Sequence, residues 1–277
     1  MHPRAMDVLD RLALNPRPGH GAARIDTGVA ALDARLGGGL EQGALHEVRA
    51  PLARDLGAAS GVLLGLLSRL CKGSGRSRVL WVMDPGVTPD AGLPCPDGIA
   101  QYGLDPGGIT LVHAVDLRAA LWAADEGARC TDLAAVVLQV KGNPARLDRL
   151  ATRRLMLRAR NSSVCVLILR QSGAAEASAA QTRWCVTPRP SAGDPALPRG
   201  IGPPAFQLTL ERSRSGQTGH WPVHWTPATR GFAHDPSPDI PAPQDAAPLR
   251  GAGLSAPADR PDRTRAMGRV VDFGRTP

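Results

Sequence analysis

IDTGVAALDARLGGGLEQGALHEVRAPLARDLGAAS, residues 25–60, is the stretch that decides the fold. Within it, GALHEVRA (43–50) predicts a strand, and ASGVLLGLLSRLC (59–71) predicts a buried helix. A strand, a loop and a helix in this order bind phosphate when the loop ends in Gly-Lys-Ser/Thr. Here the loop, from Ala50 to Ala59, has no lysine, and Gly57-Ala58-Ala59 stands in the place of Gly-Lys-Thr. The stretch therefore predicts the frame of a phosphate-binding loop without its working side chains.

The first part of the stretch, written xTGxxxLDxxLGGGLxxGxxxEV, resembles the opening of the RecA-like ATP-binding core. That resemblance implies a catalytic glutamate after the second strand, where WVMDPG (81–86) has Pro85 beside Asp84. It also implies a metal-binding aspartate at the end of strand 133–140, where this chain has Leu138-Gln139. With all three positions lost we expect no ATP hydrolysis, and nucleotide binding without hydrolysis stays an alternative.

One catalytic position is retained. The segment RRLMLRARNSSVCVLILRQ (153–171) resembles the helix and strand that lead RecA proteins to a glutamine at the γ-phosphate, followed by a DNA-contacting loop. Gln171 stands at that position, but the loop after it is short and rich in alanine. We therefore expect no cofactor and no intact cofactor site: Ala50, Gly57, Ala58 and Ala59 form a degenerate loop, and Gln171 is a residual switch.

The order of elements predicts an α/β fold. Apolar runs at 78–84, 109–114, 133–140 and 164–171 predict strands, and helical patterns lie between them at 116–130 and 144–160. Because these strands are continuously apolar, both of their faces should be buried, as in a mostly parallel twisted sheet flanked by helices. The alternating segments 206–214 and 219–225 predict an antiparallel hairpin at the sheet edge, with Ser215-Gly216 in its turn.

The composition divides the chain into three parts. Residues 1–20 predict a short helical segment, and residues 21–232 carry the RecA-like core with its degenerate loop. Residues 233–277 are rich in proline and predict a disordered tail. Large apolar residues return at Val270, Val271 and Phe273, where either a short binding motif or an unselected tail fits the pattern.

Charge and cysteine content restrict the class of protein. The net charge of +8 favours nucleic acid or acidic protein partners, although an excess of arginine also follows from a GC-rich genome. Five cysteines without CxxC spacing and the lack of a signal peptide predict a cytoplasmic protein, and no apolar run approaches the roughly 20 residues of a membrane span. His220 and His224 lie too far apart on a predicted strand to share a metal, and none is expected.

The segment 144–160 carries the strongest basic patch. At 100° per residue, four arginines fall within about 60° of one another: Arg146, Arg149, Arg153 and Arg160. A buried arc is expected opposite them, at Leu147, Leu150, Ala151, Leu155 and Leu157. Arg154 and Arg158 intrude on that arc and should be paired or extended toward solvent. The patch is either a solvated face or a surface for DNA phosphates or an acidic partner.

Several motifs taken in order resemble the ImuA family: LGGGLxxGxLHEV, YGLDP, LWAADEGARC, GNPxxLDxxATRRLxLxAR and FQLTLERSR. The resemblance covers residues 20–232 and implies a role in SOS-induced, error-prone translesion DNA synthesis. The partners that it implies are ImuB, an error-prone DNA polymerase III alpha subunit and RecA. We therefore expect a non-catalytic accessory protein, with DNA contact through the basic surface and no membrane association. A nucleotide-responsive DNA-binding ATPase of RecA type and a RecA modulator or SulA-like cell-division inhibitor are the alternatives.

Overall fold

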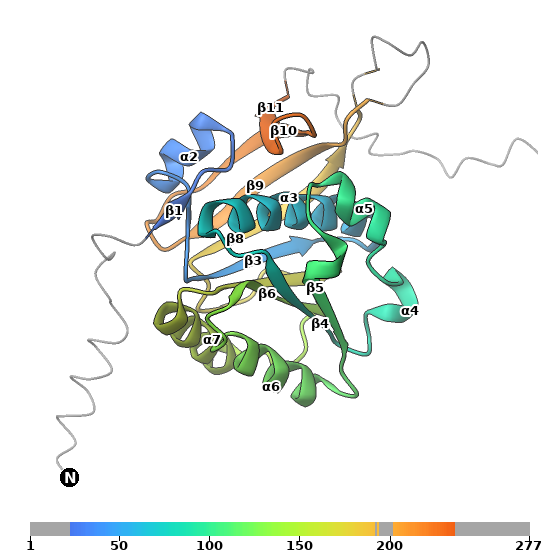
Figure 1. Ribbon diagram of the computed structural model, residues 1–277, viewed down its shortest axis with the longest axis vertical. Coiled ribbons are helices and arrows are strands. Elements are labelled where there is room, and N and C mark those ends of the chain that lie inside the picture. Colours follow the sequence, from blue (N-terminus) through green and yellow to red (C-terminus); the bar gives the residue numbers. More distant parts are fainter. Residues whose placement is uncertain (1–22, 192, 194–201, 236–277) are drawn as a thin grey trace, which may run out of the picture. The chain divides into compact units, whose positions relative to one another are not determined.

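A nine-stranded mixed sheet carries the fold (Figure 1) in the computed structural model, which describes residues 23–191, 193 and 202–235. The strand order is β11-β10-β9-β8-β3-β7-β6-β4-β5. Strands β8 to β5 in this order are parallel, and β9, β10 and β11 are antiparallel to their neighbours. The strands are β3 (Leu45–Ala50), β4 (Arg78–Met83), β5 (Ile109–His113), β6 (Leu133–Lys141), β7 (Cys165–Gln171), β8 (Thr182–Arg189), β9 (Ala205–Ser213), β10 (Gly219–Thr226) and β11 (Gly231–His234).

Helices cover both faces of this sheet, as the continuous apolar strands predicted (Figure 1). One face carries α3 (Leu56–Ser74) and α5 (Pro96–Gln101), and the other carries α6 (Leu117–Gly127) and α7 (Arg149–Ser162). The smaller elements are β1 (Arg24–Ile25), α2 (Ala30–Leu36), β2 (Leu40–Glu41), α4 (Thr88–Ala91) and the 3₁₀ turns Ala53–Asp55 and Pro106–Gly108. Of the helices in the described ranges, none combines the length and apolar character needed to cross a bilayer.

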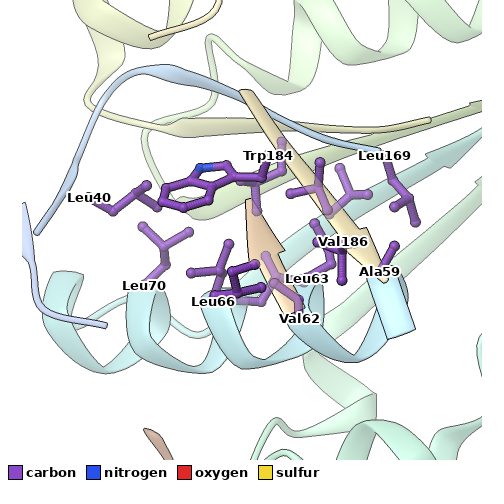
Figure 2. Close-up of a cluster of buried hydrophobic side chains, with 14 of the residues drawn as sticks. Leu40, Ala59, Val62, Leu63, Leu66, Leu70, Leu169, Trp184 and Val186 are labelled. Carbon is purple, nitrogen blue, oxygen red and sulfur yellow. The ribbon is translucent and has the colours of Figure 1, made fainter. Parts of the chain in front are cut away.

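Helix α3 forms the centre of the larger core (Figure 2). Its apolar side chains pack against side chains of β7 and β8, and the indole of Trp184 lies over the helix. Ala59 and Leu63 are fully buried, as are Leu169 and Val186 on the sheet. Burial of a large apolar side chain contributes about 1.5–3 kcal/mol, so this contact is a major source of stability.

The stretch that leads into β3 is held by a local hydrogen-bond motif. The backbone N–H and the hydroxyl of Thr27 both donate to the carboxylate of Asp33, at 2.9 Å each. Gly39 follows with φ of +111°, and a Cβ there would lie 2.3 Å from the carbonyl oxygen of Ile25. Thr27, Asp33 and Gly39 therefore have a role in the backbone geometry of this stretch.

The structure corrects the predicted edge of the sheet. The segments 206–214 and 219–225 form the hairpin β9–β10 with Ser215-Gly216 in its turn, as predicted. This hairpin is not the edge, because β11 pairs with β10 on the outer side. Strand β8, which the sequence analysis missed, joins the hairpin to β3. Its sequence TRWCVTPR mixes charged and apolar residues and includes a proline, so its pattern is weak.

The predicted helix 144–160 also needs correction. Helix α7 begins at Arg149, and the side chain of Asp148 caps it by accepting the N–H of Ala151 at 2.8 Å. Leu150 and Leu157 were expected in the buried arc, but they are 73% and 46% exposed. The helical phase explains the difference, because Thr152, Leu155, Met156 and Ala159 form the buried face, and at 100° per residue Leu150 and Leu157 lie on the side away from it.

A buried histidine links β3 to β8. The Nε2 of His46 lies 2.8 Å from the carbonyl oxygen of Glu41, and its Nδ1 lies 2.8 Å from the hydroxyl of Thr182. A carbonyl can only accept, so Nε2 carries the hydrogen and Nδ1 accepts from Thr182, whose oxygen in turn accepts the Trp184 indole N–H at 2.8 Å. Burial lowers the pKa of His46 from 6.5 to about 4. The ring is therefore neutral in the folded protein.

This lowered pKa predicts a pH dependence of stability. Below pH 6.5 the unfolded chain binds a proton at His46, whereas the folded chain binds it only near pH 4. The free energy of unfolding should thus fall by about 3 kcal/mol as the pH falls from above 6.5 to about 4. Urea unfolding at pH 7.5, 6 and 5 measures it. His46→Gln should flatten the slope, and His113→Gln, at an exposed position, should not; equal slopes in both variants would contradict the assignment.

Candidate functional site

The connection between β3 and α3 is where a RecA-like fold would bind phosphate. It is only five residues long, 51–55, and it ends in a 3₁₀ turn. The carboxylate of Asp55, which is 4% exposed, accepts the backbone N–H of Leu52 at 3.1 Å. The N–H of Asp55 donates to the carbonyl of Leu52 at 3.0 Å. A side-chain carboxylate therefore takes one of the backbone donors that a phosphate-binding loop offers to its ligand.

The residues in place of Gly-Lys-Thr lie in the first turn of α3. Gly57 is exposed, Ala58 is 8% exposed and Ala59 is fully buried in the core. Ala50 is the last residue of β3 and is also fully buried. None of the four offers a cation or a hydroxyl at this edge. The predicted degenerate loop thus consists of one exposed glycine and three alanines that serve packing.

A cavity of about 330 Å³ lies beside this turn. It is lined by Gly57 and Ser60 of α3, by Tyr102, and by Trp81 and Gln139 from the sheet. The described residues that line it include no lysine or arginine. Burial raises the pKa of Tyr102 to about 12, so the cavity wall stays neutral. Its chemistry suits an apolar group and not a triphosphate.

The two acidic positions of a RecA-like site are also changed. Gln139 stands near the expected aspartate position, and its amide oxygen accepts the indole N–H of Trp81 at 2.9 Å. Both side chains are buried, so this hydrogen bond is part of the core. Asp84 follows β4; burial raises its pKa, and a hydrogen bond from Gly86 partly offsets that rise. In the described part of the chain, no cluster of three or more potential metal ligands occurs.

Gln171, the predicted residual switch, lies at the carboxyl end of the sheet. It ends β7, and the register sets it beside Ala50 on β3. Its amide nitrogen lies 3.5 Å from the carboxylate of Asp90, and its buried amide oxygen has no hydrogen-bond partner among the described residues. Asp90 also pairs with Lys141 at 2.6 Å. The lysine that the structure brings to this edge, which sequence reasoning missed, is therefore already neutralised by a carboxylate.

A buried ion cluster lies on the α6–α7 face of the sheet. The carboxylate of Glu47 on β3 accepts from Arg170 on β7 and from Arg183 on β8, the latter at 3.3 Å. It also accepts the hydroxyl of Ser178 at 2.8 Å. Burial alone would raise the pKa of Glu47, but the two guanidinium groups and this hydroxyl hold the pKa below its usual value. The charged form is thus kept in the interior.

Side chains of this cluster and of neighbouring residues hold the segment that follows Gln171 through hydrogen bonds. Arg183 donates to the carbonyl of Glu176, and Arg212 donates to that of Ser178 at 2.6 Å. Asn143 exchanges hydrogen bonds with the backbone of Ala174 at 2.7 and 3.1 Å. The segment that occupies the place of a RecA DNA loop is therefore tied to the sheet along its length.

The predicted basic patch is divided by the structure. Arg149, Arg153 and Arg160 line one groove of about 410 Å³. Arg146 precedes α7 and lines a different hollow, between α6 and α7, with Trp122 and Leu150, and Arg153 borders both. Trp122 is 65% exposed.

The two arginines that intrude on the α7 arc, Arg154 and Arg158, pair with Asp125 of α6 at 3.1 and 3.4 Å. The sequence left pairing and solvent extension open, and the structure shows pairing.

Some residues that the sequence predicted lie outside the described ranges, and some residues of the site were not predicted. Val270, Val271, Phe273 and the predicted helical segment 1–20 lie outside the described residues. Sequence reasoning missed Arg24, Arg212 and Arg214, which line the groove with α7. It also missed Glu47, although a carboxylate inside the apolar strand ALHEVRA signals a buried partner.

The fold defines a RecA-like protein, and its connection between β3 and α3 has no lysine. The crystal structure of the RadB recombinase superposes with a TM-score of 0.51 and 19% identity, over 76% of this chain and 99% of that chain. This likeness concerns the fold. No protein-family model matches the chain.

Two curated relatives show the family. Protein ImuA of Caulobacter vibrioides strain NA1000 / CB15N is 31% identical over 196 residues, which cover 67% of this chain and 76% of that protein. Protein ImuA of Caulobacter vibrioides strain ATCC 19089 / CIP 103742 / CB 15 matches to the same extent. The chain belongs to the ImuA family.

The ion cluster yields a prediction on stability. Glu47→Gln leaves Arg183 buried without its carboxylate partner and Arg170 with only the carboxylate of Glu176 at 3.9 Å, so the free energy of unfolding should fall by about 3–5 kcal/mol. Chemical denaturation measures the loss. The matched control is Glu126→Gln, which removes a carboxylate from the exposed Glu126–Arg129 pair and should cost under about 1 kcal/mol. Similar losses in the two variants would contradict the role given to Glu47.

Proposed function

We propose that this protein is a non-catalytic accessory factor of SOS-induced, error-prone translesion DNA synthesis. It acts through protein contacts with ImuB, with the error-prone DNA polymerase III alpha subunit, with RecA, or with several of these. The observation that carries the proposal is the connection between β3 and α3, where Asp55 accepts a loop N–H and the single cation, Arg54, is out of register with the lysine of a phosphate-binding loop. Transfer of a phosphoryl group needs such cations to stabilise the developing charge.

Membership of the ImuA family supports the cellular role, since that family is associated with the mutagenesis cassette. The RecA-like body supports a mode of action by shape, in which the protein presents surfaces of a RecA protomer to a partner. The segment after Gln171 also supports action by shape, because hydrogen bonds to Asn143, Arg183 and Arg212 hold it in place. A surface held in one conformation costs less entropy to bind.

A nucleotide-responsive ATPase of RecA type is the second candidate. It is favoured by one observation, the retained Gln171 with an unpartnered buried amide oxygen among the described residues. A bound group could satisfy that oxygen. Lys141 lies opposite Gln171 on the neighbouring strand and pairs with Asp90 at 2.6 Å. A RecA modulator or SulA-like division inhibitor would use the same fold by binding alone.

Turnover of ATP separates these candidates. The purified protein, with and without single-stranded DNA, should release no phosphate above a buffer blank, because the loop has no lysine and no Mg²⁺-binding hydroxyl in register. Gln171→Ala should leave that background unchanged. RecA assayed in parallel is the positive control. Turnover that disappears in Gln171→Ala would replace the non-catalytic proposal with the ATPase.

Contact with the partner is tested by pull-down. Tagged ImuB should retain the full-length protein, and deletion of residues 262–277 should weaken the retention if Val270, Val271 and Phe273 form a binding motif. A Val270→Ser/Phe273→Ser variant of the full chain is the matched test of those side chains. Unchanged retention in both would assign the contact to the folded core. The same assay with RecA tests modulation by direct binding.

A further inference from the structure

A second concave site lies away from the closed phosphate loop. Its groove of about 410 Å³ runs beside Thr182, the first residue of β8, and Ser213, the last residue of β9. The phosphate loop follows Ala50, at the other end of the parallel strands. Six arginines from three elements, β1, α7 and β9, and from the turn after β9 line the groove: Arg24, Arg149, Arg153, Arg160, Arg212 and Arg214. Of the described residues that line it, Glu41 alone is acidic.

Helix geometry explains why α7 contributes three of these arginines. Positions 149, 153 and 160 fall within about 40° of one another at 3.6 residues per turn. The row they form is about 16 Å long at 1.5 Å rise per residue. Met156 and Leu157 lie between them in the groove wall.

Hydrogen bonds to the backbone hold three of the arginines in place. Arg24 donates to the carbonyls of Leu36 and Gly39 at 2.8 and 3.2 Å, and its other terminal nitrogen lies 3.8 Å from Glu41. Arg214 donates to the carbonyl of Ala179 at 3.2 Å, and Arg212 to the carbonyl of Ser178. The guanidinium groups are thus positioned before any ligand arrives, which reduces the entropy lost on binding.

The positive charge in the groove exceeds the negative charge that faces it. Partial burial lowers the pKa of Arg214, and the charges of Arg160, Arg212 and Arg149 lower it further, against the opposing effect of Glu41. Like charges held together in a half-enclosed site repel one another, and a bound anion relieves that repulsion. The groove is therefore built for a ligand with several negative charges.

The lining favours carboxylates on a peptide over nucleic acid. Leu157, which is 46% exposed, contributes apolar surface beside the arginines, and a phosphodiester backbone has no apolar group to place there. The described lining residues include no Trp, Tyr or Phe on which a base could stack. Planar guanidinium groups pair with carboxylates through two parallel hydrogen bonds.

We propose that this groove binds an acidic peptide segment of a partner protein, whose carboxylates pair with the arginines while an apolar side chain contacts Leu157. The inference rests on the proposed action through protein contacts and names the site and the chemistry of one such contact. It also divides the arginines of the basic patch, because Arg146 lines another hollow and takes no part.

Fluorescence anisotropy tests the proposal on the full-length protein without nucleotide, at 150 mM salt. The probe is a labelled 12-residue peptide of the repeat Glu-Asp-Leu. Comparison probes are the repeat Glu-Asp-Ser and a 12-nucleotide oligo-dT. The leucine peptide should bind more tightly than both. Arg149→Gln/Arg160→Gln should weaken it about tenfold, because two charge-assisted pairs are lost.

A matched double variant controls for net charge. Arg78→Gln/Arg129→Gln removes the same charge from exposed positions outside the groove and should leave the affinity unchanged. Thermal melting checks that all variants fold, and the groove variant should melt at the same temperature or higher because repulsion is relieved. Arg146→Gln should also leave binding unchanged.

Four results would overturn the proposal: no peptide binding, equal weakening in both double variants, equal binding of the serine peptide, or tighter binding of oligo-dT that the groove variant abolishes. The last result would assign the groove to nucleic acid. ATP turnover measured on the same preparations keeps the two proposals apart. If the peptide does not bind and no ATP turnover is seen, only the groove assignment is overturned. If ATP turnover is seen, the non-catalytic role is overturned, whether or not the peptide binds.

Discussion

The carboxylate of Glu47 is the constraint on which the rest of the structure depends. It joins three neighbouring strands, since it lies on β3 and accepts from Arg170 on β7 and Arg183 on β8. Charges buried in this way are costly unless every partner is present, so the cluster requires this strand order. Through Ser178 the cluster also holds the segment after β7, and that segment forms one wall of the basic groove. The ion cluster at the centre of the sheet thus helps to position one wall of the basic groove.

The two ends of the parallel strands have opposite character. At the carboxyl end, Asp55 accepts a loop N–H, and Lys141 pairs with Asp90. Beside the start of β8, six arginines face a single acidic side chain among the described lining residues. The proposed action by contact assigns the acidic partner to this groove.

Sequence patterns predicted elements well where each strand was continuously apolar. Runs such as VLILRQ in β7 belong to the buried interior on both faces, and burial makes them recognisable without any partner strand. The sequence pattern did not predict strand β8, because its residues alternate between the core around Trp184 and the ion cluster around Arg183. The start of α7 was placed too early because Arg146 fits the helical period although the capping residue is Asp148.

The sequence by itself determined the central strand, loop and helix, the loss of the phosphate-binding side chains, and the position of Gln171, because these follow from local order and residue type. Only the tertiary structure decided which charges meet. Glu47 lies more than 120 positions from Arg170 and Arg183 in the sequence. Arg24 and Arg214, which lie far before and far after α7 in the sequence, line the same groove as the α7 arginines. Such pairings depend on strand order and register, which bring distant residues together, and no local spacing encodes them.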